Sequence, residues 1–274
     1  MTKLHALAEL VAEGGVVVLS GAGISTESGI PDYRGPSGQL RHQTPMTYQT
    51  FTGDATARQR YWARSHLGWQ TIAQAAPNAG HRAVAQLERA GLVDGIVTQN
   101  VDGLHQAAGA REVIELHGSL AQVACLGCGE LTTRDELHRR LHDANPAFHG
   151  QASAINPDGD VDLSDDALRG FATVECLTCL GGILKPDVVF FGETVPPGRV
   201  AAAYALVEKA NALLVLGSSL MVMSGRRFVI RAVKLGIPVA IVNQGVTRAD
   251  ANATLTIDAP LGVVLPALVN QAFN

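Results

Sequence analysis

Four cysteines form two pairs along the chain, Cys125 with Cys128 and Cys176 with Cys179, and two residues separate the members of each pair. This spacing allows a tight turn in which both sulfurs face one point, so two pairs can supply four thiolates to one tetrahedral Zn²⁺. A pair of redox cysteines is the alternative. Four sulfur ligands leave no coordination position for water, so the pattern predicts a structural rather than a catalytic metal.

Three polar residues follow predicted strands in otherwise apolar surroundings: Asn100, Asp102 and His117. A lone histidine in such a place is more often structural. An imidazole, however, is the side chain best matched to general-base work near neutral pH. Because His117 and Asn100 both follow strands, we expect them at the same edge of a sheet.

A glycine-rich turn, Gly21-Ala22-Gly23, follows the apolar run 16–19. Glycines there let backbone N–H groups approach a phosphate. These three residues alone are about equally consistent with an ordinary strand-to-helix turn that binds nothing. The dinucleotide fingerprint G-x-G-x-x-G fails because position 26 is Thr26. An NAD-dependent dehydrogenase would also carry an acidic residue roughly 20 positions further on, where residues 41–43 are Arg, His and Gln.

The order of elements predicts an α/β fold. Continuous apolar runs at 16–19, 95–98, 212–216 and 238–242 indicate strands covered on both faces, as in a parallel sheet. Helical patterns at 81–89, 200–209 and 226–234 separate them. The result is a Rossmann-like, doubly wound parallel sheet whose ligands bind beyond the carboxyl ends of its strands.

Two segments interrupt this alternation, a predicted helical insertion at 34–75 and a cysteine-bearing module at 121–182. We therefore expect a large domain from residues 1–33, 76–120 and 183–274, and a smaller inserted domain that binds zinc. The second insertion carries an acidic stretch, interpreted as a solvated loop. An EF-hand fails there because Leu163 replaces the required glycine and Arg169 the terminal glutamate.

Composition excludes several classes of protein. With 47% hydrophobic residues and a net charge of −4, the 274-residue chain is neither disordered nor globally attracted to nucleic acid or anionic membranes. No apolar stretch approaches the roughly 20 residues that span a bilayer, and nothing resembles a signal peptide. The sequence predicts a cytoplasmic protein.

The motifs together resemble the sirtuins, the NAD-dependent protein-lysine deacylases. The resemblance rests on residues 21–35 (GAGISTESGIPDYRG), 98–105 (TQNVDGLH), 116–118 (LHG), 189–193 (VFFGE), 217–220 (GSSL) and the cysteine pairs. Residues 61–64, 157–161 and 185–188 resemble the class II branch related to mitochondrial sirtuin four. With no transit-peptide-like extension before Leu4, we expect a bacterial member of that branch.

The resemblance implies NAD as co-substrate, bound between the two domains, and one structural Zn²⁺ held by the four cysteines. The implied NAD contacts are Gly21, Ala22, Gly23, Ser25, Thr26, Ile30, Asp32, Tyr33, Arg34, Gln99, Asn100, Asp102, Gly217, Ser218, Ser219, Asn243, Gln244, Gly245 and Leu261. Many relatives have cysteine where this chain has Leu261, and a backbone contact survives that change.

The chemistry implied is acyl transfer to ADP-ribose with release of nicotinamide, in which His117 is the general base and Asn100 the second catalytic residue. An acyl-lysine protein or peptide would add a strand beside residues 189–193, and Val189, Phe191 and Gly192 would contact it. Mono-ADP-ribosyl transfer on the same scaffold is the alternative activity. A non-catalytic zinc-ribbon module is a further rival, but it would not need Asn100, Asp102 and His117 at one edge.

The acyl group is predicted from Tyr61 and Arg64, whose Tyr-x-x-Arg spacing matches sirtuins that remove acidic acyl groups. Three residues apart on a helix, the two side chains could face one pocket. A packed tyrosine and a solvent-facing arginine are an equally compatible interpretation. The hypothesis is a weak general deacetylase with better activity on longer or acidic acyl chains.

Overall fold

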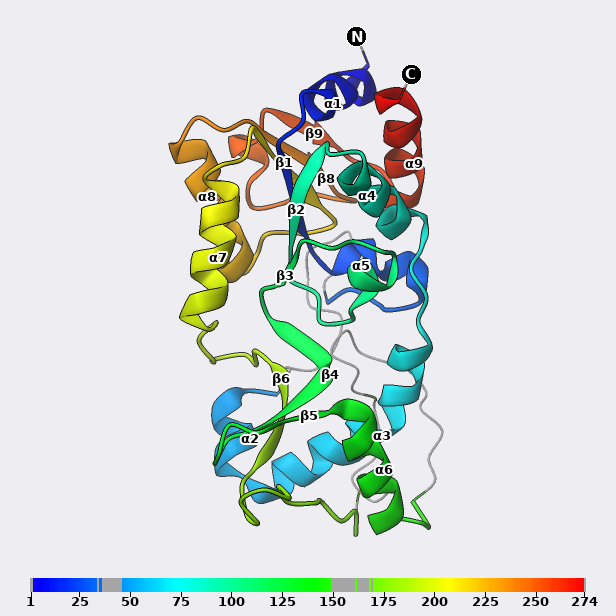
Figure 1. The fold of residues 1–274 in the computed structure, drawn as a ribbon, viewed down its shortest axis with the longest axis vertical. Coiled ribbons are helices and arrows are strands. Elements are labelled where there is room, and N and C mark those ends of the chain that lie inside the picture. Colours follow the sequence, from blue (N-terminus) through cyan, green and yellow to red (C-terminus); the bar gives the residue numbers. More distant parts are fainter. Residues whose placement is uncertain are drawn as a thin grey trace.

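The structure is a computed structural model that describes residues 2–33, 35, 46–148, 161, 168 and 170–273. Arg34 and the acidic run at 158–166, apart from Val161, lie outside the described residues, as does most of the motif at 157–161. The chain forms a large α/β part and a smaller part below it in Figure 1, and the two termini lie close together at the far end of the large part.

The large part is built on one parallel sheet of six strands in the order β3-β2-β1-β7-β8-β9. The strands are β1 (Val16–Ser20), β2 (Val93–Thr98), β3 (Val113–Glu115), β7 (Ala212–Leu216), β8 (Val239–Val242) and β9 (Leu255–Ile257). Because the chain crosses from β1 outward in both directions, the predicted doubly wound sheet is confirmed.

Helices cover both faces of this sheet, as the continuous apolar strands predicted. Val16 and Val18 of β1 pack into one buried cluster, whereas Val17 and Leu19 pack into another on the opposite face. The first face carries α1 (Lys3–Ala12), α4 (Ala79–Arg89) and α9 (Leu261–Ala272), and the second carries α7 (Pro197–Val207) and α8 (Met223–Lys234). Every residue of β1 is buried, which explains why the run carries no polar alternation.

The smaller part has a core of its own around an antiparallel sheet in the order β5-β4-β6. Its elements are α2 (Tyr48–Gly53), α3 (Ala55–Gln74), β4 (Gly118–Cys125), β5 (Leu131–Thr133), α6 (Arg134–Ala144) and β6 (Leu184–Val188). Of the helical insertion expected at 34–75, residues 34 and 36–45 lie outside the described part of the chain, and most of the rest is helical in α2 and α3. β4 crosses the expected boundary at 120, and β6 lies in the range expected for the large domain, which begins at 183. The domain division itself stays a prediction.

A buried arginine joins two helices of this smaller part. Arg134, the first residue of α6, is 1% exposed, and its guanidinium lies 5.4 Å from the ring centroid of Trp62 and 5.2 Å from that of Trp69, both on α3. It also donates to the backbone oxygen of Ser65 at 3.0 Å. Stacking between two indoles stabilises the cation after it has lost its water.

The carboxyl ends of the parallel strands open into the turns that position the site. β1 leads into two short 3₁₀ helices, η1 (Ala22–Ile24) and η2 (Thr26–Ser28), and β2 leads toward α5 (Leu104–Ala107). A third 3₁₀ helix, η3 (Asp250–Asn252), precedes β9. Within the described residues, no helix combines the length and apolarity needed to cross a membrane.

Candidate active site and metal centre

A cavity of about 330 Å³ lies at the carboxyl edge of the parallel sheet. It gathers most of the predicted site residues from six separate segments, each of which follows a strand. Those in its lining are Gly21, Ala22, Gly23, Ser25, Ile30, Asp32, Tyr33, Gln99, Asn100, Asp102, His117, Val189, Phe191, Gly192, Gly217, Ser218, Ser219, Asn243 and Gln244.

Five described residues among those predicted to contact NAD or substrate lie outside this lining. Thr26 and Gly245 belong to segments that supply lining residues, and Leu261 is the first residue of α9. Tyr61 is fully buried in the smaller part, where its ring packs edge-on against those of Phe51, at 5.3 Å, and Phe190, at 5.3 Å. Arg64, half-buried on the same helix, does not line the cavity either.

Close backbone packing shapes the cavity floor. A Cβ on Gly21 would lie 2.8 Å from the carbonyl oxygen of Gly217, and one on Gly23 would lie 2.8 Å from the Cα of Gly217. Gly217 itself has φ +60°, in the left-handed region. Any side chain here would push the two turns apart, so the backbone forms a cradle of the kind that fits a dinucleotide phosphate.

A hydrogen-bonded network behind the cradle holds Asn100 and Asp102. The Oγ of Ser25 donates to the Asp102 carboxylate at 2.7 Å and accepts from the Asn100 side-chain amide at 3.0 Å. The same amide donates to the Gly21 carbonyl at 3.2 Å, which ties β2 to the glycine turn. Asp102 also accepts from the backbone N–H of Leu104 at 3.0 Å.

Two buried histidines extend the network, and sequence reasoning missed both. His81 Nδ1 accepts from the backbone N–H of Asn78 at 3.4 Å, so its protonated Nε2 points at Ser25, 3.5 Å away. His105 Nε2 lies 2.9 Å from the Oγ of Ser20. His81 lies in the first turn of α4 and His105 in α5, and although His105 ends the motif at 98–105, the sequence predicted no role for either histidine.

Burial shifts the titration of these groups. Desolvation lowers the pKa of His81 to about 4 and that of His105 to about 3, so both are neutral at physiological pH. Desolvation raises the pKa of Asp102, although the Leu104 N–H and the Ser25 hydroxyl oppose that rise. The site therefore holds its polar atoms by hydrogen bonds rather than by paired charges.

His117 enters the cavity with both ring nitrogens engaged. Nδ1 lies 2.8 Å from the backbone carbonyl oxygen of Gln99, and Nε2 lies 2.8 Å from the Oγ of Ser224. Desolvation lowers the pKa of the ring, while the Gln99 carbonyl opposes that shift. A half-buried imidazole that is neutral and whose Nε2 accepts a hydrogen bond can act as a general base.

The edge formed by residues 189–192 is anchored from three directions. Val189 N–H donates to the carbonyl of His117 at 2.8 Å, and the Phe191 carbonyl accepts from Tyr48 N–H at 2.9 Å. The buried Lys185 pairs with Glu193 at 3.0 Å, and that carboxylate accepts from the Phe190 N–H at 2.8 Å. Phe191 remains 41% exposed beside the cavity.

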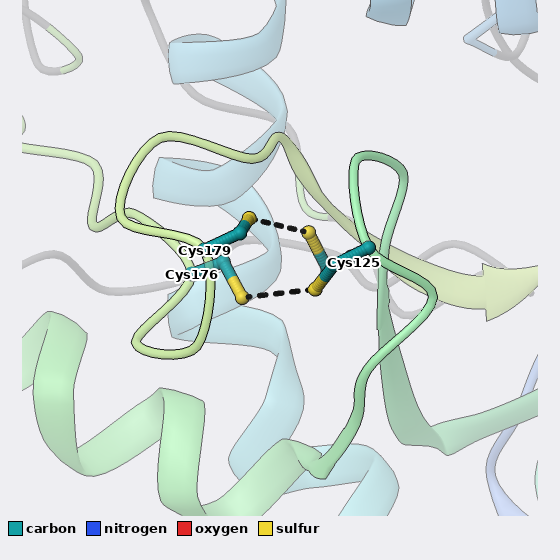
Figure 2. A group of neighbouring side chains, drawn as sticks. Cys125, Cys176 and Cys179 are labelled. Carbon is teal, nitrogen blue, oxygen red and sulfur yellow. Dashed lines mark hydrogen bonds between the residues drawn. The ribbon is translucent and has the colours of Figure 1, made fainter.

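The four cysteines converge at the far end of the smaller part. Cys125 Sγ lies 3.6 Å from Cys179 Sγ, and Cys128 Sγ lies 3.7 Å from Cys176 Sγ, the pairings dashed in Figure 2. These separations are too long for disulfides. Four sulfurs about 2.3 Å from one Zn²⁺ in a tetrahedron would lie about 3.8 Å apart, so the arrangement fits this metal. All four sulfurs lie within 4.8 Å of one another.

Comparison with known proteins gives consistent results. The model of the family described as Sir2 matches residues 21–224. The chain is 58% identical over 270 residues to an NAD-dependent protein deacetylase 1 of Streptomyces coelicolor, covering 98% of this chain and 90% of the relative. It is 51% identical over 270 residues to the protein of the same name from Mycobacterium avium, covering 97% and 94%.

Solved structures agree with the sequence comparison. A structure described as Sir2-p53 peptide-NAD+ superposes with a TM-score of 0.79 at 30% identity, over 99% of both chains. Another, of Sir2Tm bound to a propionylated peptide, gives a TM-score of 0.78 at 28% identity, again over 99% of both chains. The likeness spans both the parallel sheet and the cysteine-bearing part.

Proposed function

The chain belongs to the Sir2 family, and from this premise we propose that it is an NAD-dependent protein-lysine deacylase that removes acetyl groups and passes them to ADP-ribose. The relatives at 51–58% identity are NAD-dependent protein deacetylases, which supports the activity. The zinc at the four cysteines would have a structural role, because four thiolates fill its coordination and leave no position for water or substrate.

One observation carries this proposal, the neutral imidazole of His117 at the cavity wall. Its Nδ1–H is fixed by the Gln99 carbonyl, so Nε2 is the atom that accepts a proton. Asn100 and Asp102 lie within the same cavity and are held by Ser25. An imidazole in this tautomer, next to an amide and a carboxylate, suits proton abstraction from a hydroxyl group.

Bound NAD would supply an activated ribose carbon that takes the acyl oxygen as nicotinamide leaves. In our proposal the cradle of Gly21, Gly23 and Gly217 holds the pyrophosphate, and Asn100 orients the ribose. His117 takes the proton of a ribose hydroxyl at Nε2. The turn at 243–245 and the start of α9 at Leu261 would hold the adenosine end.

The acyl-lysine substrate would lie along the edge 189–192. Backbone groups rather than charged side chains would recognise it, so the protein needs no basic surface. The net charge of −4 is consistent with this. A relative in complex with a p53 peptide supports a peptide substrate. We further propose that the protein acts in the cytoplasm.

We propose that the enzyme prefers acetyl and other uncharged acyl groups to acidic ones. Its apolar lining includes Met46, Val101 and Leu220, and neither Tyr61 nor Arg64 contributes to it. The two residues keep their predicted role in acyl recognition only as a hypothesis. Because Arg64 does not line the cavity, the Arg64→Ala variant should change activity on acetyl-lysine and glutaryl-lysine peptides to the same extent, whereas a larger loss on the glutaryl peptide would support the hypothesis.

The decisive experiment is mass spectrometry of the products from NAD and a panel of acyl-lysine peptides. O-acyl-ADP-ribose, nicotinamide and free lysine should form with the wild-type chain, and His117→Ala should lower the rate of acyl transfer by about 100-fold or more. ADP-ribose attached to the peptide would instead indicate ADP-ribosyl transfer. Free ADP-ribose without deacylated peptide would refute the proposal.

A further inference from the structure

The two hydrogen bonds of His117 assign its proton. A backbone carbonyl only accepts, so the Gln99 oxygen at 2.8 Å places the proton of the neutral ring on Nδ1. The Ser224 hydroxyl, 2.8 Å from Nε2, must then donate to the remaining lone pair. Ser224 therefore contacts the one ring atom that can take up a proton in catalysis.

The start of α8 fixes Ser224 in this place. Ser224 is the second residue of the helix and lines the same cavity as His117. The next residue, Gly225, packs against the side chain of Gln99, because a Cβ there would lie 2.4 Å from its Oε1. That side-chain amide donates to the Oγ of Ser218 at 2.8 Å.

Residues at the start of α8 therefore help to fix both nitrogens of the imidazole. Ser224 holds Nε2 directly, and Gly225 leaves room for the residue whose backbone carbonyl holds Nδ1. A ring bonded at only one nitrogen can still rotate about its Cβ–Cγ bond. A second bond across the ring fixes its plane, and a catalytic group misplaced by about 1 Å can cost on the order of 100-fold in rate.

We propose that Ser224 is a positioning residue for acyl transfer, whose hydroxyl keeps the His117 ring in the Nδ1–H tautomer and aimed into the cavity before the co-substrate binds. The inference rests on the proposed function, in which Nε2 is the general base. When a substrate hydroxyl binds, it replaces the Ser224 hydroxyl as the donor to Nε2. Ser224 then remains next to His117 in the cavity wall.

The test compares Ser224→Ala with Ser224→Thr, which retains a hydroxyl on Cβ. For Ser224→Ala we expect kcat for deacylation to fall about 10- to 100-fold, with KM for NAD and for peptide within about twofold of wild type. In the free enzyme, the ¹⁵N resonance of His117 Nε2 should move downfield, because its lone pair loses a hydrogen bond. Ser224→Thr should restore both the rate and the resonance.

Met223→Ala is the matched control, because Met223 is the preceding residue of α8, is 52% exposed and does not line the cavity. Its rate and its His117 resonance should equal those of wild type. Gly225→Ala is a second, independent variant, and it should lower kcat by displacing the Gln99 amide while the melting temperature changes little.

An unchanged resonance and unchanged kcat in Ser224→Ala would overturn the proposal. A rise in kcat would overturn it as well, because the serine would then compete with the substrate for Nε2. The resonance is measured without NAD or peptide, so it tests the contact between Ser224 and His117 even if the wild-type enzyme transfers no acyl group. Failure of the proposed function and failure of this inference are therefore distinguishable.

Discussion

Ser25 holds Asn100 and Asp102, the two polar side chains that we place beside NAD, in position. Its single hydroxyl donates to Asp102, accepts from Asn100 and faces Nε2 of His81, and it is 1% exposed. Both lone pairs and the proton are therefore used. A buried polar group that loses its partner costs about 1–3 kcal/mol, so removing this hydroxyl affects several groups together.

The Ser25→Ala variant should weaken NAD binding by about tenfold or more, because Asp102 and Asn100 lose the atom that orients them. Calorimetric titration of NAD measures the affinity. Ser28→Ala is the control: it lies on the same loop, outside the cavity lining, and accepts one hydrogen bond from Asn78. Equal NAD affinity in Ser25→Ala and wild type would contradict the role assigned to the network.

At this scale the sequence was informative about residues with chemistry and uninformative about their supports. Asn100, Asp102 and His117 stood out because polar side chains interrupt apolar runs at strand ends, and all three line the cavity. Ser224 did not stand out, because a serine at the start of a helix is common. Its importance depends on a contact between residues that are 107 positions apart.

Among the elements, the small sheet is the one that depends most on the cysteine centre. Cys125 ends β4, and Cys176 and Cys179 lie in the turn before β6. Gly182 is packed against them, since a Cβ there would lie 2.2 Å from the sulfur of Cys125. The metal would close the sheet at one end, while β4 continues at its other end into His117.

Removing the metal should therefore unfold the small sheet before the parallel sheet. We expect chelation, or the Cys179→Ser variant, to remove one zinc per chain and to lower the melting temperature, since structural zinc sites supply folding free energy. Elemental analysis and calorimetry measure the two effects. A zinc-free chain with the wild-type melting temperature and activity would show that the four cysteines have no structural role.

The elements also show where sequence patterns stop being sufficient. β1, β2, β7 and β8 were predicted because apolar residues fill both faces of a parallel strand. β6 was not, because it contains Lys185 and Pro186, and the lysine is buried by pairing with Glu193. β9 has three residues, and α9 begins after Pro260 with no side-chain cap, so neither gave a strong local signal.

For the whole molecule, buried histidines predict a loss of stability in mild acid. Desolvation lowers the pKa of His66, on α3 beside His138 and Arg134, to about 4, and those of His81 and His105 to about 4 and about 3. In the unfolded chain each returns to about 6.5. Between these values the unfolded state binds more protons, so acid favours unfolding.

The free energy of unfolding should be greatest above about pH 6.5 and should fall by on the order of 5 kcal/mol between pH 7 and pH 5, about 2 kcal/mol for each of the three histidines. Urea titrations at several pH values measure the slope. His66→Phe should reduce it, since a phenyl ring suits the neighbouring Phe148 and Phe171; a flat profile in the wild-type chain would exclude the effect.

The stacking of Arg134 between Trp62 and Trp69 has a practical consequence, because these are the only two tryptophans of the chain. Both belong to α3 in the smaller part, so the intrinsic fluorescence of the protein, excited at the indole band, reports on that part alone. The parallel sheet carries no indole. A cation held against both rings also makes their emission sensitive to small displacements of α6. The two parts can thus be followed separately without any label, by fluorescence for one and by circular dichroism for the whole.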